Sequence, residues 1–281
     1  MTLQAKCRPA LWAAIGAAAL LCSCSGTSAP QPGTPAFFWA AARETWGQGD
    51  YLKTIDHLDK LSSDSEYGGR ARPWLMVVTS GMAQGYIDLA DAYETGARAN
   101  KADPLSFRRL AANYRNTASR LAQHYAETYQ DFQKSQQGDS VTLAFPYPGG
   151  SATPVATLAK AANGIMPPPN EAETAQKRAV TRQVLLTACR AAGAPDDLAK
   201  TQELLKAGEA KVPRPVFLAA AARSLYDYSQ LYTPARLDDP GKMKIFCERA
   251  QDALKAVPES KETKELSGKI ATALKPGKRP L

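Results

Sequence analysis

The sequence has few of the side chains that carry catalysis or hold a metal. It contains two histidines, His57 and His124, and neither has a second histidine or a carboxylate motif at the spacing of metal ligands. The five cysteines show no zinc-ligand spacing, and no nucleophile elbow, P-loop or dinucleotide-binding fingerprint occurs. We therefore predict that the protein is not an enzyme and uses no metal and no cofactor.

An apolar stretch long enough to span a membrane as a helix is also lacking. The apolar run at residues 10–22 has 13 residues, whereas a spanning helix needs about 20. The leader before this run carries Lys6 and Arg8 and no acid. A short apolar run behind a basic leader is typical of a secretion signal. We therefore expect residues 1–23 to be a signal peptide.

The residues that close this segment carry a recognisable motif. Residues 21–24 read Leu-Cys-Ser-Cys and resemble the lipobox of bacterial lipoproteins. The resemblance implies that Cys24 takes a diacylglycerol thioether, with a further acyl chain such as palmitate, and anchors the protein in a membrane. Cys22 fits less well because the bulky Leu21 directly precedes it. The alternative is a secreted protein with a coincidental cysteine at this position.

The residues after Cys24 indicate where the anchor takes the protein. Ser25, rather than Asp, resembles the sorting pattern of lipoproteins sent to the outer membrane, facing the periplasm. Residues 24–35 are small, polar and rich in proline and glycine, as expected of a flexible tether. Without residues 1–23, 33 basic and 27 acidic residues remain, a net charge of +6. Such a charge suits an anionic lipid or glycan surface. Because the protein is expected to be exported, we predict no nucleic-acid partner.

Most of the remaining chain is predicted to be helical. Alanine leads the apolar residues, and apolar positions recur at three- and four-residue steps. The predicted helices cover residues 35–47, 51–61, 73–100, 105–134, 171–193, 195–207, 214–232, 240–257 and 259–274. Pro73 is expected at the first position of the third helix.

The long segment of residues 135–170 interrupts the helical pattern. It is rich in proline and glycine, and Val141, Leu143 and Phe145 alternate in it like a short extended piece. A functional loop and a connector are both open, and we predict a connector. The domain organisation is then N-terminal helical hairpins at 36–134, this connector, C-terminal helices at 171–275 and a tail at 276–281.

Two segments resemble tetratricopeptide (TPR) repeats. Residues 49–58 are similar to the turn and second helix of such a repeat, and Ala250, Ala253 and Leu254, followed by Pro258, resemble the close of one. Together they cover about a fifth of the mature chain. Thr54 and Phe246 depart from the small residues of the pattern. The predicted fold class is all-α, a TPR-like stack of helical hairpins (α-solenoid) without a regular repeat period.

A narrower resemblance concerns the order of the helices. The segments Gly81 to Thr95, Phe107 to Tyr129, Phe217 to Tyr232 and Asp238 to Pro258 are similar in order and composition to the lipoprotein T components of TRAP-type transporters. This resemblance implies a pore through the helical stack that receives a hydrophobic ligand. It implies no individual ligand contacts.

Three groups of side chains are candidates for binding. A basic surface is expected from Arg98, Lys101, Arg108, Arg109, Arg115 and Arg120, which could face anionic headgroups or an acidic partner, or serve as a solvated face. The aromatic residues expected to line a groove or cavity, or to fill the core, are Tyr86, Tyr93, Tyr114, Tyr125 and Tyr228. Asp88, Asp91 and Glu94 share a helix face and could bind a cation or form a solvated acidic edge.

Two cysteines remain for disulfide chemistry once Cys24 is lipidated. Cys189 and Cys247 both lie on apolar helical faces, so either a disulfide in an oxidising compartment or two buried thiols is open.

The predicted function follows from the expected location and fold. We expect a lipid-anchored scaffold or adaptor in a cell-envelope complex, whose partner is an envelope protein or peptide bound along the helical stack. The alternative is a carrier of a hydrophobic small ligand in a cavity. An apolar tunnel through the helices favours the carrier, whereas a solid core with an open, polar-rimmed groove favours the scaffold.

Overall fold

A computed structural model describes residues 30–136, 138–195 and 197–275. The predicted signal peptide, Cys22, Cys24, most of the predicted tether and the predicted tail lie outside the described residues. Within the described part the all-α prediction is confirmed, with ten α-helices, one short 3₁₀ helix and two four-residue strands. The helices are α1 (Pro35–Gly47), α2 (Tyr51–Asp59), α3 (Gly68–Ala99), α4 (Pro104–Ser135), α5 (Ala156–Ala162), α6 (Pro169–Ala191), α7 (Leu198–Leu205), α8 (Arg214–Ser229), α9 (Pro240–Leu254) and α10 (Lys261–Leu274). The 3₁₀ helix is η1 (Gln230–Tyr232), and the strands are β1 (Ser140–Leu143) and β2 (Ala210–Pro213).

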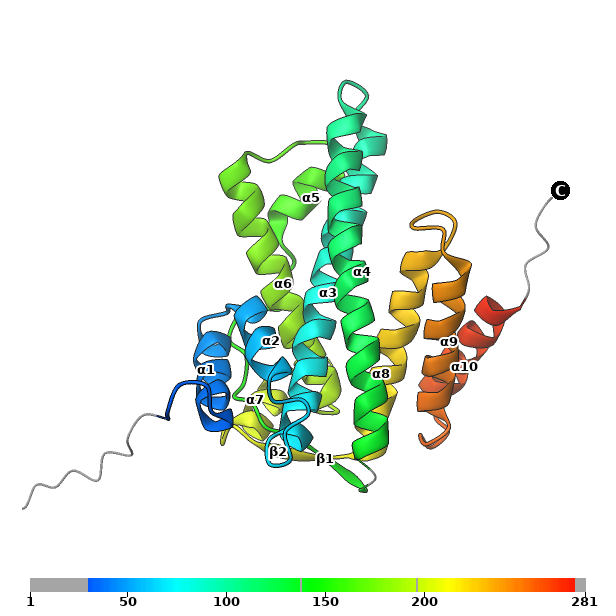
Figure 1. The fold of residues 1–281 in the computed structure, drawn as a ribbon. Coiled ribbons are helices and arrows are strands. Elements are labelled where there is room, and N and C mark those ends of the chain that lie inside the picture. The colour runs from blue at the N-terminus through cyan, green and yellow to red at the C-terminus, as the bar shows by residue number, and fades with distance from the viewer. Residues whose placement is uncertain (1–29, 137, 196, 276–281) are drawn as a thin grey trace, which may run out of the picture.

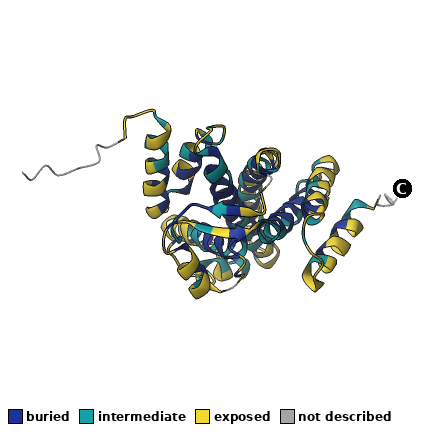
Figure 2. Ribbon diagram, turned by 90° about the horizontal axis from the view of Figure 1, so that it is seen from below, coloured by how far each residue is buried: buried dark blue, intermediate teal, exposed yellow. Residues whose placement is uncertain are grey.

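The long helix α3 is the centre of the fold. It forms an antiparallel hairpin with α4 and also packs against α2, α5 and α6 (Figure 1). The helices α8, α9 and α10 form a second group that packs on α4 and α6. Figure 2 shows that the buried residues lie on the sides of the helices that face one another. In a solenoid each repeat contacts only its neighbours, whereas α3 contacts helices far along the chain, so the regular solenoid geometry is not seen here.

The contact between α3 and α6 depends on two glycines. Gly81 and Gly85 lie one turn apart on α3, and a Cβ atom on Gly81 would be 2.3 Å from the Cα of Val184. A Cβ atom on Gly85 would be 2.7 Å from the Cα of Val180. The backbones of the two helices therefore approach more closely than any residue with a side chain permits, which brings the C-terminal helices into the same core as α3.

The helix α3 begins earlier than the sequence predicts. Its first residue is Gly68, so Pro73 lies inside the helix and not at its start. A proline inside a helix leaves the carbonyl four residues earlier without its donor. Here that carbonyl belongs to Gly69, and it accepts a hydrogen bond from the side-chain amide of Gln136 at the end of α4. This contact across the hairpin explains why the prediction of a start at Pro73 was wrong.

The segment of residues 135–170 contributes to the core. Val141 and Leu143 lie on β1 and are buried, as is Phe145 just after it. The alternation at Val141, Leu143 and Phe145 predicts an extended piece, and β1 is that piece. It pairs antiparallel with β2, with Val141 opposite Val212. The segment also contains α5, which packs against α3. Residues 135–170, expected to connect two helical units, thus pack with both of them.

Candidate functional site

An open apolar groove runs beside α8. It lies between the end of α6, the beginning of α8 and the turn that joins α9 to α10, and its volume is about 560 Å³. Its apolar lining consists of Pro195, Pro213, Pro215, Val216, Ala219, Ala220, Val257 and Pro258. Its polar lining consists of Arg190, Arg223, Ser260 and Thr263, together with Gly193. We call this feature the α8 groove.

The local sequence explains why this surface is hollow and apolar. Pro213 is the N-cap of α8 and Pro215 lies in its first turn, where the missing N–H of proline costs nothing. One turn later, Ala219 and Ala220 present only methyl groups. Gly193 has a φ of +71° after the end of α6, and a Cβ there would be 2.6 Å from Val216. Prolines and small residues therefore surround the groove without filling it.

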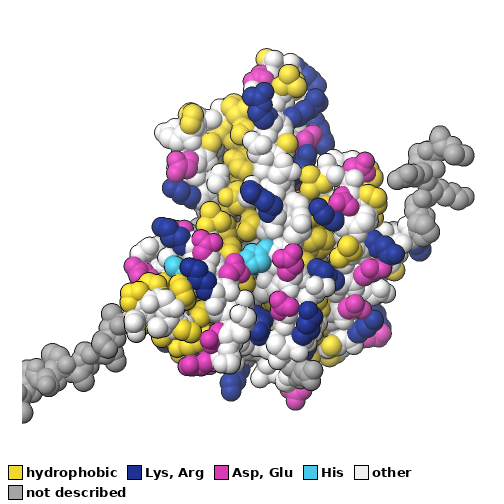
Figure 3. All heavy atoms as spheres, viewed as in Figure 1, with side chains coloured by type: hydrophobic (Ala, Val, Ile, Leu, Met, Phe, Trp, Pro, Cys, Tyr) yellow, Lys and Arg dark blue, Asp and Glu magenta, His cyan; other side chains and the backbone are white. Residues whose placement is uncertain are grey.

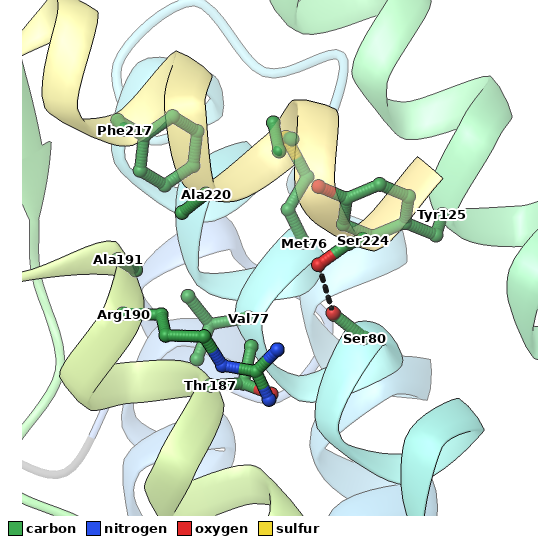
Figure 4. Close-up of a pocket in the computed structure, with 11 residues that line it drawn as sticks. Met76, Val77, Ser80, Tyr125, Thr187, Arg190, Ala191, Phe217, Ala220 and Ser224 are labelled. Carbon is green, nitrogen blue, oxygen red and sulfur yellow. Dashed lines mark hydrogen bonds between the residues drawn. The ribbon is translucent and has the colours of Figure 1, made fainter. Parts of the chain in front are cut away.

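A small polar pocket adjoins the α8 groove and shares Arg190 and Ala220 with it. Its volume is about 10 Å³, roughly the space that one water molecule needs. Figure 4 shows Arg190 and Thr187 extending from α6, with Ser80 on α3 and Ser224 on α8 nearby. The hydroxyl oxygens of Ser80 and Ser224 are 3.0 Å apart. The pocket thus collects a guanidinium and several hydroxyl groups beneath an apolar surface.

The hydroxyl groups of this pocket belong to a buried network. The Tyr228 hydroxyl lies 2.6 Å from the Ser80 hydroxyl and 2.9 Å from the Ser80 carbonyl oxygen, and it donates to them. Burial raises the pKa of the Tyr125 and Tyr228 hydroxyls, so both stay protonated near neutral pH. The Thr187 hydroxyl is buried but has no hydrogen-bond partner. A buried polar group without a partner is unusual, and it gives the pocket an unused donor and acceptor.

Arg190 is the cation of the pocket, and it has no carboxylate partner. Its Nε donates to the Leu186 carbonyl oxygen at 3.3 Å. No carboxylate oxygen of a described residue lies within 4.0 Å of the Arg190 guanidinium nitrogens, the distance that defines an ion pair. Asp227 is paired with Arg223 at 3.0 Å. Burial raises the pKa of Asp227, while the charges of Arg223 and Arg190 oppose that rise. A half-buried, unpaired guanidinium suits a carboxylate or phosphate brought by a ligand.

The five tyrosines expected to line a groove lie in two aromatic clusters. Tyr114 contacts Tyr86 and Tyr93 between α3 and α4, with ring centroids 6.0 and 5.6 Å apart. Tyr125 meets Tyr228 edge to face at 5.5 Å. Four of the five are buried, and Tyr114 is half-buried with its pKa raised by burial to about 12. Tyr125 lines the pocket beside Arg190, and Tyr86 borders a separate surface depression. These tyrosines mainly fill the space between helices.

The six residues of the expected basic surface do not form a single patch. Arg98, Lys101, Arg108 and Arg109 are exposed around the turn that joins α3 to α4. Arg120 is exposed farther along α4. In contrast, the Arg115 side chain is only 12% exposed and forms an ion pair with Glu94 at 3.1 Å. Arg115 therefore belongs to the contact between α3 and α4 and not to the surface.

The three acidic residues on one face of α3 are engaged by arginines. The ion pairs are Asp88–Arg182 at 3.6 Å, Asp91–Arg236 at 2.7 Å and Glu94–Arg115 at 3.1 Å. They join α3 to α6, to the segment after η1 and to α4. Among the described residues, no group of three or more His, Cys, Asp or Glu side chains is arranged to hold a metal ion.

The two cysteines considered for a disulfide are buried thiols in the structure. Cys189 lies on α6 near Tyr147, and Cys247 lies on α9 near Ser229. Burial raises the pKa of the Cys247 thiol. The two sulfurs are not joined, which agrees with the alternative of buried thiols on apolar faces. No helix in the described ranges combines the length and apolarity required to cross a membrane.

The α8 groove was not predicted from the sequence. It is made of proline, alanine and valine residues from three separate segments, and each of them looks ordinary in its own segment. The signal that could have indicated it is the run of prolines at 213 and 215 followed by alanines at 219 and 220. No family model, curated protein or solved structure matches this chain.

Proposed function

We propose that the protein is a scaffold or adaptor of the cell envelope that binds an apolar, carboxylate-bearing segment of a partner polypeptide in the α8 groove. The observation that carries this proposal is the unpaired Arg190 beside an open apolar groove of about 560 Å³. That volume is in the range of ligand pockets, roughly 300–1,000 Å³. Apolar side chains of the partner occupy the proline and alanine surface, and its carboxylate binds Arg190, which borders the groove.

The geometry favours a scaffold over a carrier of an enclosed ligand. The small pocket between α3, α6 and α8 beneath the groove admits only a water-sized group. The α8 groove, in contrast, is an open surface feature bordered by Arg190 and Arg223. A solid core with an open, polar-rimmed groove suits a polypeptide ligand whose ends continue beyond the site.

Photocrosslinking in the intact cell envelope tests the groove. We expect a photoreactive amino acid in place of Ala219 to capture a defined partner polypeptide, whereas the same probe in place of Ile245, exposed on α9, captures none. Adding Arg190→Gln is expected to lower the crosslink yield about tenfold, because a charge-assisted hydrogen bond is worth about 1.5–3 kcal/mol. Arg178→Gln, which removes an exposed arginine on the same helix, is the matched control and leaves the yield unchanged.

The outcome that contradicts the proposal is equally specific. If Ala219 and Ile245 give the same crosslinked proteins, or if Arg190→Gln and Arg178→Gln have equal effects, the groove is not the binding site. If only a small hydrophobic molecule is captured at Ala219, the carrier replaces the scaffold.

The location in the envelope is tested separately at Cys24. We expect Cys24→Ala to abolish incorporation of a labelled fatty acid, and either to release the protein from membranes washed with high salt or to stall its processing, because the acyl chains provide the stable anchor. Cys22→Ala is the matched control and keeps both the label and the attachment. Retention of the label by Cys24→Ala would show that the lipidation site has been assigned wrongly. The salt wash removes contacts that depend on charge alone.

A further inference from the structure

The turn that joins α3 to α4 stands beside a second loop at one end of the molecule. The turn comprises residues 100–103, and the second loop, residues 163–168, joins α5 to α6. The side-chain amide of Asn100 donates to the Gly164 carbonyl oxygen at 3.0 Å. A Cβ atom on Gly164 would lie 2.9 Å from the backbone nitrogen of Asn100. The two loops are thus held together, and we call them, with the first two turns of α4, the hairpin tip.

The hairpin tip exposes large apolar side chains. Leu105 is 69% exposed, Ile165 59% and Met166 37%. These are three of the six large hydrophobic residues that are exposed in the described chain. Single exposed apolar residues need no explanation, but a group of them at a protruding end indicates a contact surface. The turn that joins α3 to α4 projects beyond the start of α6 and beyond the group of α8, α9 and α10 (Figure 1).

Basic side chains surround these apolar residues. Arg98, Lys101, Arg108 and Arg109 are exposed near the turn, and Lys160 is exposed at the end of α5. Two acids oppose these five positive charges: Glu94, which lies 3.9 Å from Arg98, and Asp103, whose carboxylate accepts from the backbone N–H of Ser106 at the start of α4. Figure 3 shows Lys and Arg side chains gathered at this end of the hairpin beside hydrophobic ones. Lys101, Arg108, Arg109 and Lys160 form no ion pair with a described residue.

We propose that the hairpin tip docks on the surface of an anionic phospholipid bilayer. Leu105, Ile165 and Met166 enter the boundary between headgroups and acyl chains, and the surrounding lysine and arginine side chains contact lipid phosphates. The shape favours a bilayer over an acidic protein. A bilayer accepts a narrow, convex end with flexible aliphatic side chains, whereas a protein partner must supply a complementary concave surface.

This contact is separate from the proposed N-terminal anchor. The described chain begins beside α1, which packs on the first turns of α3 through Trp39 and Trp74, with ring centroids 5.4 Å apart. The hairpin tip is at the other end of α3, about 48 Å away for a helix of 32 residues. The tip therefore lies at the opposite end of α3 from the helix α1, near which the described chain begins.

Vesicle binding of the full chain tests the tip, with Cys24→Ser in every variant so that no acyl chain dominates. We expect binding to phosphatidylcholine vesicles that contain phosphatidylglycerol, and weakening as salt is added. Replacing Lys101, Arg108 and Arg109 with glutamine is expected to weaken this binding roughly 100-fold, since each basic residue near an anionic surface contributes about fivefold. The control replaces Lys200, Lys211 and Lys261, which are exposed elsewhere, with glutamine and keeps the binding.

Insertion of the apolar residues is measured independently with tryptophan. Brominated lipids in the anionic vesicles are expected to quench the new indole of Leu105→Trp strongly and that of Leu52→Trp hardly at all, although Leu52 on α2 is 58% exposed. The proposal is overturned if the protein with Cys24→Ser alone does not bind anionic vesicles, or if the two triple variants bind equally. It is also overturned if binding depends on the tip charges but the indole of Leu105→Trp is not quenched, because the apolar residues then do not enter the bilayer.

Discussion

The variant Gly81→Ala is expected to lower the free energy of unfolding by about 3 kcal/mol. The new Cβ atom would lie 2.3 Å from the Cα and 2.7 Å from the backbone nitrogen of Val184. Because these are backbone atoms of α6, no side-chain rotation relieves the clash, and the two helices must separate. The separation loses apolar contacts along the whole crossing of α3 and α6. It also outweighs the gain of about 1 kcal/mol that alanine brings to a helix interior.

The matched control for this variant is Gly268→Ala. Gly268 also lies inside a helix, α10, but no atom lies within 4 Å of its added Cβ. Here only the helix propensity changes, so we expect a gain of about 0.5–1 kcal/mol. Unfolding in urea, followed by circular dichroism and tryptophan fluorescence, measures both changes. Equal effects of the two substitutions would contradict the close crossing of α3 and α6.

Helix boundaries that depend on neighbouring residues could be predicted from the sequence. The side chain of Thr34 accepts from the backbone N–H of Phe37, and Pro35 follows it at the first helical position. Asp239 caps α9 in the same way before Pro240. The α3 start is only partly local: Asp64 accepts from the backbone N–H groups of Glu66 and Tyr67, but the Gly69 carbonyl that Pro73 leaves free is satisfied by Gln136, 67 residues away. Strand β2 was missed because a four-residue strand is defined by its partner β1.

In the candidate sites, too, local patterns could be predicted from the sequence, whereas contacts between distant segments could not. Periodicity indicated that Tyr86, Tyr93 and Tyr114 face inward, but it could not indicate whether a groove or another helix meets them. Charge density identified the exposed arginines of the hairpin tip, yet it could not separate them from Arg115, because Glu94 reaches Arg115 only after the hairpin forms. Arg190 looks like any arginine near the end of a helix. Its importance comes from Thr187, Ser80 and the α8 groove, which only the fold brings together.

The variant Trp74→Ala is expected to lower the free energy of unfolding by about 4 kcal/mol. Trp74 is fully buried and its ring lies 5.4 Å from Trp39, 5.6 Å from Trp46 and 5.9 Å from Phe145. This cluster joins α1, α3 and the residues after β1, and the Trp46 indole N–H fixes it further by donating to the Pro146 carbonyl oxygen at 2.9 Å. Alanine removes the central ring and leaves a cavity that three separate segments would have to fill.

The conservative variant Trp74→Phe distinguishes packing from polarity. The indole N–H of Trp74 is buried without a hydrogen-bond partner, so phenylalanine loses some volume but also removes an unsatisfied donor. We expect it to cost about 1 kcal/mol, well below the cost of alanine.

The number of unfolding transitions in urea tests whether the core is a single unit. Because α3 shares its core with both α1 and α6, Trp74→Ala should still unfold in one transition, with fluorescence and circular dichroism coinciding. Two separated transitions would mean that residues 135–170 join independent units, and that the core described around α3 does not unfold as one body.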